Sequence, residues 1–181
     1  QYVVEEAVAS GFDDILIITG RNKRAIEDHF DVSAELNLHL QNSENLELLE
    51  ASERLSNLAN IHYIRQKEQR GLGDAVLCAK QHVGDEPFAV LLGDTICFPD
   101  EGEKPCTAQL ADVYCKTDLP VIGVEEVPEH KIKDYGIIDG VLLGERLYDV
   151  VDIIEKPSPE EAPSNSGAMG RYLLTADIFD I

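Results

Sequence analysis

Hydrophobic positions in the first half of the chain switch between helical spacing and short unbroken runs. Helical spacing predicts helices over 1–10, through Ile26 and Phe30, and in a two-part excursion over 34–58. Gly11 is a typical residue to end the first of these helices. The continuous apolar run at 15–18, mostly β-branched, predicts a strand buried on both faces, and 61–65 predicts a second strand.

The second half continues this alternation and then changes character. The pattern predicts a helix from Asp74 through Ala79, a strand at 88–92, a helix through Ala108 and Val113, and a strand at 120–124. Short strands near 136–139, 149–154 and 168–174 follow, with no helix between them. Strands that alternate with helices imply crossovers and a largely parallel sheet, whereas the later strands imply an antiparallel addition. The expected fold class is therefore α/β.

Composition and charge limit the classes of molecule that the protein is expected to bind. The 181 residues carry 35 Asp and Glu against 15 Lys and Arg, a formal net charge of -20. Such a chain is a poor partner for nucleic acid and is repelled by anionic membrane surfaces. No apolar stretch approaches the ~20 residues that span a bilayer, and no signal-like segment opens the chain. We expect a cytoplasmic protein that contacts neither nucleic acid nor membrane.

Cysteine and histidine patterns offer no covalent or zinc chemistry. The four cysteines, at positions 78, 97, 106 and 115, form no C-x-x-C pair, so we expect reduced thiols. The five histidines are scattered along the sequence, and no Ser-His-Asp or Cys-His arrangement can be identified. The pattern favours chemistry based on positioning and charge stabilisation.

Polar residues that follow the predicted strands are the first candidates for a site, because α/β sheets bind ligands at the carboxyl ends of their strands. One basic island, Arg65, Lys67 and Arg70, precedes the glycines at 71 and 73; a second, Arg21, Lys23 and Arg24, follows the first strand. Cations beside glycines suit an anionic ligand. The alternative is a plain turn with solvated charges.

Two further strand ends carry charged residues. Asp94 follows the strand at 88–92 and is placed to hold Mg²⁺ against a phosphate, although a turn or helix-cap role is an alternative. Glu155 and Lys156 would project to opposite faces of a regular strand. If Pro157 ends the strand, both reach one cleft, where the ammonium suits a phosphate and the carboxylate suits hydroxyls. A solvated surface pair is the alternative. Together the residues at these strand ends predict a site that binds a phosphate, a divalent cation and a hydroxylated group.

Ordered blocks of residues resemble the bacterial and archaeal UTP–glucose-1-phosphate uridylyltransferases, which are sugar nucleotidyltransferases. The blocks are 1–7, 15–20 with 26–31, 71–79, 84–88, 134–138, 154–157, and 162–165 followed by 170–172. The resemblance covers nearly the whole chain. It implies a Rossmann-like three-layer α/β/α nucleotidyltransferase fold with a mixed, mostly parallel central sheet.

The resemblance also implies individual roles. Gln66 and Gly71 match residues that hydrogen-bond the uracil edge, and Asp94 matches the aspartate that binds Mg²⁺. Gly136 matches a glycine whose backbone contacts the sugar. Glu155 matches the acceptor of glucose hydroxyls, and Lys156 matches the lysine that contacts the phosphate. Asp94 and Lys156 are thus the expected catalytic residues and Mg²⁺ the expected cofactor. The expected partners are UTP, glucose 1-phosphate and further copies of the chain in a homo-oligomer.

The implied reaction is in-line attack of the sugar phosphate on the α-phosphorus of UTP, giving UDP-glucose and pyrophosphate. The alternatives are the same chemistry with dTTP or ATP, and a non-catalytic binding module that keeps the fold.

The family pattern departs from this chain at a few places. A Gly-rich phosphate loop is expected before Gln1 and a Gly-Asp-Glu-Ile segment after Ile181. We therefore expect residues 1–181 to belong to a single nucleotidyltransferase domain of which they are a fragment, inactive by itself. Gly93 stands where many bacterial members have proline, and the segment 99–104 is shorter than the family pattern predicts.

Overall fold

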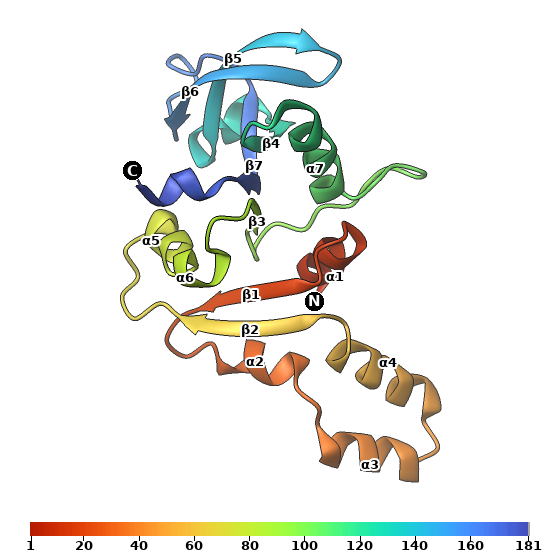
Figure 1. Cartoon of the computed structure of the whole chain (residues 1–181). Coiled ribbons are helices and arrows are strands. Elements are labelled where there is room, and N and C mark those ends of the chain that lie inside the picture. The colour runs from red at the N-terminus through yellow and green to blue at the C-terminus, as the bar shows by residue number, and fades with distance from the viewer. Residues whose placement is uncertain (181) are drawn as a thin grey trace. The chain divides into compact units, whose positions relative to one another are not determined.

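The computed structural model describes residues 1–180, which cluster into two compact units (Figure 1). Unit 1 comprises Gln1–Pro87 and the segment from Ala176 onward, and unit 2 comprises Phe88–Thr175. Helices and strands alternate through most of the chain, so the expected α/β class is confirmed. No helix among the described residues is long and apolar enough to cross a membrane.

Unit 1 contains two strands and most of the helices. Its elements are α1 (Tyr2–Ala9), β1 (Asp14–Thr19), α2 (Arg24–Phe30), α3 (Ala34–Asn42), α4 (Leu46–Ser56), β2 (Asn60–Arg65), α5 (Leu72–Leu77), α6 (Lys80–Val83) and the 3₁₀ helix Ala176–Asp180. The predicted two-part excursion is confirmed as α3 and α4. Each begins at a capping side chain, since Ser33 Oγ accepts from the Leu36 N–H and Asn45 Oδ1 accepts from the Leu48 N–H, both at 3.4 Å.

The strands β1 and β2 form a parallel pair in unit 1, side by side in Figure 1. Their register joins Asp14 to Asn60 and Thr19 to Arg65, so both strands end at the same edge. The prediction that 15–18 is buried on both faces is wrong, because these residues are only half-buried. Among the described residues β1 has a ladder partner on one side, so its other edge lacks the cover that a central strand has.

Unit 2 is built around strand β7 (Ser166–Leu174). Its other elements are β3 (Phe88–Leu91), α7 (Cys106–Thr117), β4 (Val121–Glu126), a 3₁₀ turn at Glu129–Asp134, β5 (Gly136–Gly144) and β6 (Leu147–Glu155). β7 pairs antiparallel with β3, β4 and β5, and β5 pairs antiparallel with β6. Ile137, Ile138 and Leu173 are almost fully buried where β5 and β7 form the core.

Strand direction follows the connections between strands. α7 joins β3 to β4 as a crossover helix, whereas β5 and β6 are joined by a tight turn that permits only antiparallel pairing. The antiparallel addition predicted for the later strands is confirmed. Parallel pairing, which we expected to dominate the sheet, is limited in residues 1–180 to β1 and β2.

Candidate functional site

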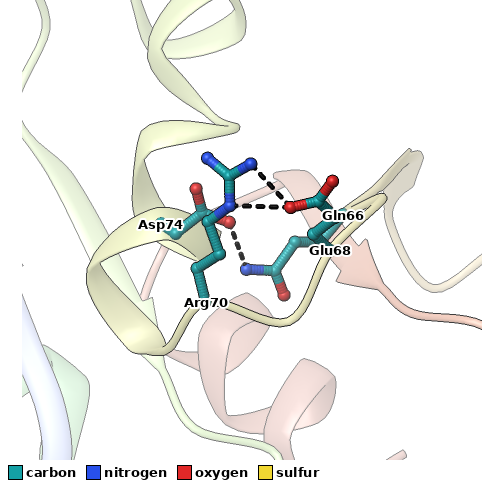
Figure 2. Close-up of polar contacts among 4 residues, drawn as sticks. All are labelled: Gln66, Glu68, Arg70 and Asp74. Atoms are coloured by element: carbon teal, nitrogen blue, oxygen red, sulfur yellow. Dashed lines mark hydrogen bonds and ion pairs between the residues drawn. The ribbon is translucent and has the colours of Figure 1, made fainter.

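Gln66 and Gly71, the predicted uracil contacts, meet in unit 1 just beyond the end of β2. The Gln66 backbone N–H donates to the carbonyl oxygen of Thr19 at 2.8 Å, which ties it to the end of β1. Its side-chain Nε2 donates to Asp74 Oδ2 at 2.6 Å (Figure 2). It also donates to the Gly71 carbonyl oxygen at 3.4 Å. Sequence reasoning placed Asp74 at the start of a helix and missed this contact.

Gly71 turns the chain back toward Gln66. Its φ of 107° lies in a region that side chains with a Cβ rarely adopt, so glycine is needed there. Helix α5 starts directly after it at Leu72, two positions before the predicted start at Asp74. Asp74 therefore lies in the first turn of α5, where it can reach the Gln66 amide.

The two basic islands contribute cations to one pocket, and an arginine of each island is paired with a nearby carboxylate. Arg70 donates through Nε and Nη2 to one oxygen of Glu68, at 2.9 and 2.6 Å, so an acidic neighbour offsets its charge (Figure 2). Arg24 is also paired, with Asp28 Oδ1 at 3.6 Å. Lys23, Arg24 and Arg65 line a pocket of ≈ 140 Å³ at the carboxyl ends of β1 and β2, together with Glu27. Cations from both islands thus meet, and Arg70 of the expected set is paired locally.

Asp94 lies in unit 2, exposed in the turn that follows β3. A buried arginine stabilises this turn through two hydrogen bonds. Arg171 Nη2 donates to the Thr95 carbonyl at 2.9 Å, and Nη1 donates to the Leu92 carbonyl at 3.3 Å. The Leu92 N–H also donates to the Gly170 carbonyl at 2.9 Å. Both flanks of Asp94 are therefore fixed to β7, and its carboxylate stays accessible.

Arg171 is a positioning residue that the sequence reasoning did not single out. It is fully buried, with 0% of its surface exposed. Burying a guanidinium is costly unless acceptors surround its N–H groups, and the turn carbonyls supply such acceptors. The signal in the sequence was an arginine inside the otherwise apolar strand at 166–174.

Glu155 and Lys156 come together because the strand ends between them. β6 ends at Glu155, and Lys156 adopts φ 49°, a left-handed conformation that is strained for a lysine. Its backbone N–H donates to the Tyr135 carbonyl at 3.0 Å, and its Nζ lies 3.7 Å from Glu155 Oε1. The two side chains therefore do not point to opposite faces of β6. Lys156 is 60% exposed and Glu155 75% exposed, which is also compatible with the solvated surface pair, so a shared cleft stays a prediction.

Gly136 lies directly across from Glu155 in the β5–β6 ladder. A Cβ atom at position 136 would lie 3.1 Å from Glu155 Oε2, so glycine leaves the room that this carboxylate occupies. Burial and the negative charge of Glu155 raise the pKa of the Tyr172 phenol on β7. Gly136, Glu155, Lys156 and Tyr172 therefore form one neighbourhood within unit 2.

The donor set at Asp94 fits a magnesium ion that is held partly by substrate. Within residues 1–180, Asp94 belongs to no cluster of three His, Cys, Asp or Glu ligand atoms close enough to share an ion. Protein sites for Mg²⁺ often use one or two carboxylates, with water and phosphate oxygens completing the shell. An accessible carboxylate on a fixed turn suits that arrangement and does not suit an all-protein cage.

Comparison with known proteins identifies the family. The nucleotidyl transferase family model matches residues 1–181, so the chain belongs to that family. It is 54% identical over 181 residues to the UTP–glucose-1-phosphate uridylyltransferase YngB of Bacillus subtilis, covering all of this chain and 60% of that protein. A second uridylyltransferase of that organism is 53% identical over 179 residues, again with 60% of its length covered. The chain thus spans about 60% of the length of these relatives.

Solved structures agree with the sequence relatives. An apo UDP-glucose pyrophosphorylase matches with a TM-score of 0.91 at 39% identity, covering 99% of this chain and 66% of that one. A UDP-glucose pyrophosphorylase complexed with UDP-glucose gives 0.87 at 39% identity, and a UTP-bound enzyme from Acinetobacter baumannii gives 0.89 at 36%; each match covers 99% of this chain and 64% of the other. The nucleotidyltransferase fold predicted from the sequence is confirmed.

Proposed function

We propose that the complete protein transfers a uridylyl group from UTP to glucose 1-phosphate, releasing pyrophosphate and forming UDP-glucose. The observation that carries this proposal is 54% identity, along the whole chain, to a uridylyltransferase. Residues 1–181 then form part of one nucleotidyltransferase domain. The geometry of the two clusters supports the proposal because each offers the groups that one part of this reaction needs.

The cluster of unit 1 suits the nucleotide base. Gln66 and Gly71 are the proposed uracil contacts, through an amide side chain and a backbone N–H. Within residues 1–180 the Gly71 N–H has no hydrogen-bond partner in the protein, so it can donate to a carbonyl of the base. An acceptor from Gln66 beside a donor from Gly71 complements the N3–H and an adjacent carbonyl of uracil.

The cluster of unit 2 suits the sugar phosphate. The Lys156 ammonium is the proposed phosphate contact, and Glu155 accepts hydrogen bonds from glucose hydroxyls. Gly136 brings backbone close to the sugar, as a side chain there would crowd Glu155 Oε2. The Lys156 ammonium lies 3.7 Å from Glu155 Oε1, so both groups can contact one bound sugar phosphate.

Asp94 is the proposed ligand of Mg²⁺, which when bound offsets negative charge on the phosphate oxygens. In the reaction an oxygen of glucose 1-phosphate forms a bond to the α-phosphorus of UTP. The bond from that phosphorus to the bridging oxygen of the β-phosphate breaks, and pyrophosphate leaves with the electron pair. Lys156 and Asp94 contribute by position and charge, and neither forms a covalent bond to substrate.

The expected homo-oligomer and the cytoplasmic location are part of the same proposal. Exposed apolar side chains on the β5–β6 hairpin support self-association, because monomers rarely expose large apolar patches. They are Val141, Leu142, Leu143 and Val151, each at least 60% exposed. Sedimentation of the complete protein tests this directly: a monomer at micromolar concentration would contradict the expected oligomer.

A nucleotide panel tests the proposed reaction. The complete protein is mixed with Mg²⁺, glucose 1-phosphate and one of UTP, dTTP, ATP or CTP, and pyrophosphate release is followed. We expect UTP to give the highest kcat/KM, with dTTP next because thymine shares the N3–H edge. A preference for ATP would contradict the uridylyl assignment. No release with any nucleotide would support the binding-module alternative.

A further inference from the structure

We propose that Asp74 is a positioning residue that sets the base specificity of the enzyme. By holding the amide nitrogen of Gln66, it turns the amide oxygen toward the base and so selects bases that present an N–H donor. The inference rests on the proposed function, since it concerns how the base of the nucleotide is recognised.

The orientation of the Gln66 amide follows from its partners. Its NH₂ group has two hydrogens, and both neighbours are acceptors. They are Asp74 Oδ2 at 2.6 Å (Figure 2) and the Gly71 carbonyl oxygen at 3.4 Å. An ionised carboxylate can only accept. Rotating the amide by half a turn would bring Oε1 against the Asp74 oxygen, where two acceptors repel. Amide orientations are often ambiguous in proteins, but here the chemistry of the neighbours determines it.

The two residues are held independently of each other. The Gln66 backbone is tied to Thr19, and Asp74 is in the first turn of α5, where its carbonyl accepts from the Cys78 N–H at 3.2 Å. Both residues are half-buried, whereas the loop between them, 67–70, is exposed. The contact at 2.6 Å therefore joins two anchored backbone points, and it restrains the Gln66 side chain without support from the loop.

This restraint decides which base edge fits. The amide keeps Oε1 as an acceptor, which matches the N3–H of uracil. Cytosine presents an acceptor at N3, so it would face Oε1 with no hydrogen between them. Without Asp74 the long contact to the Gly71 carbonyl, at 3.4 Å, alone restrains the NH₂ group, so the amide could rotate and offer NH₂ to cytosine instead. An unpaired polar group in a bound complex weakens it by about tenfold or more, so the carboxylate should contribute at least that much to the choice of base.

The test is the ratio of kcat/KM for UTP to kcat/KM for CTP, measured with Mg²⁺ and glucose 1-phosphate in the complete protein. We expect Asp74→Ala to lower this ratio about tenfold or more, chiefly by raising KM for UTP and lowering it for CTP. Asp74→Asn keeps the shape but can donate as well as accept, so we expect an intermediate ratio. Glu68→Ala is the matched control, since it removes a carboxylate from the adjacent loop that contacts Arg70 and not Gln66.

The outcomes separate the inference from the proposed function. A parallel loss with both nucleotides in Asp74→Ala, or the same ratio change in Glu68→Ala, would overturn the role of Asp74. Absence of pyrophosphate release by the unmodified protein would instead contradict the proposed function. Titration calorimetry of UTP and CTP with the three variants then still tests Asp74: an unchanged binding ratio would overturn the inference, and a reduced ratio would support it.

Discussion

Gln66 in unit 1 and Lys156 in unit 2 each follow the last residue of a strand, but different interactions hold their side chains. Gln66 is restrained by a side-chain contact to Asp74. Lys156 is placed by the backbone, through its left-handed conformation and its N–H bond to the Tyr135 carbonyl. Asp94, also in unit 2, is likewise placed by its turn, which the buried Arg171 holds.

This difference suggests that the proposed base contact in unit 1 can be changed separately from the backbone structure, whereas the contacts in unit 2 depend on it. A contact between side chains can be altered while the backbone stays intact, so we expect a substitution at Asp74 to change the proposed choice of base with little effect on stability. The cluster of unit 2 depends on strand register, a strained residue and a buried charge, so changes to these supporting features affect the fold and the reaction together. The predictions below test this contrast.

The largest effect is expected at Asp94. Asp94→Ala removes the proposed metal ligand, and we expect kcat/KM for pyrophosphate release to fall by more than about 10²-fold while the melting temperature stays close to that of the unmodified protein. Asp100→Ala is the control, because it removes an exposed carboxylate from the loop that follows in the same unit. Full activity in Asp94→Ala, or an equal loss in Asp100→Ala, would remove Asp94 from the site.

Substitution of Arg171 tests whether its hydrogen bonds stabilise the turn that contains Asp94. Arg171→Met keeps the bulk but removes the arginine donor from the Thr95 carbonyl and one of two donors from the Leu92 carbonyl. We therefore expect a loss of about 2 kcal/mol in the free energy of unfolding. Asp74→Ala should cost less than about 1 kcal/mol, because its partner is only half-buried and can turn to water. Urea unfolding measures both, with Lys133→Met as an exposed-cation control. Equal losses of unfolding free energy in Arg171→Met and Asp74→Ala would contradict the proposed difference between the two units.

A smaller effect is expected from Tyr172 at alkaline pH. Burial and the charge of Glu155 raise its pKa, so the folded protein holds this proton more tightly than the unfolded chain does. The resulting stability is fully present below the ordinary tyrosine pKa of about 10 and is lost as pH rises through the higher folded value. Tyr172→Phe should therefore lose less stability than the unmodified protein above about pH 10. Parallel pH curves for the two proteins in urea unfolding would contradict this assignment.

Much of this organisation could be predicted from the sequence. Hydrophobic runs located the strands, and Pro157 after Glu155–Lys156 indicated where β6 ends. The residues that hold the clusters were harder to see. Asp74 opens a helical pattern and Arg171 sits in a strand, and their partners lie eight and more than seventy positions away along the chain. Such pairings depend on how the chain folds back on itself, which hydrophobic periodicity does not specify.

The central claim is that unit 1 selects the base while unit 2 handles the sugar phosphate, and one crossed measurement tests it most directly. For Asp74→Ala and Glu155→Gln in the complete protein, the UTP-to-CTP ratio of kcat/KM is measured together with KM for glucose 1-phosphate. We predict that Asp74→Ala changes only the ratio and that Glu155→Gln raises only the KM for glucose 1-phosphate. If either substitution moved both quantities together, the division of roles between the units would be wrong.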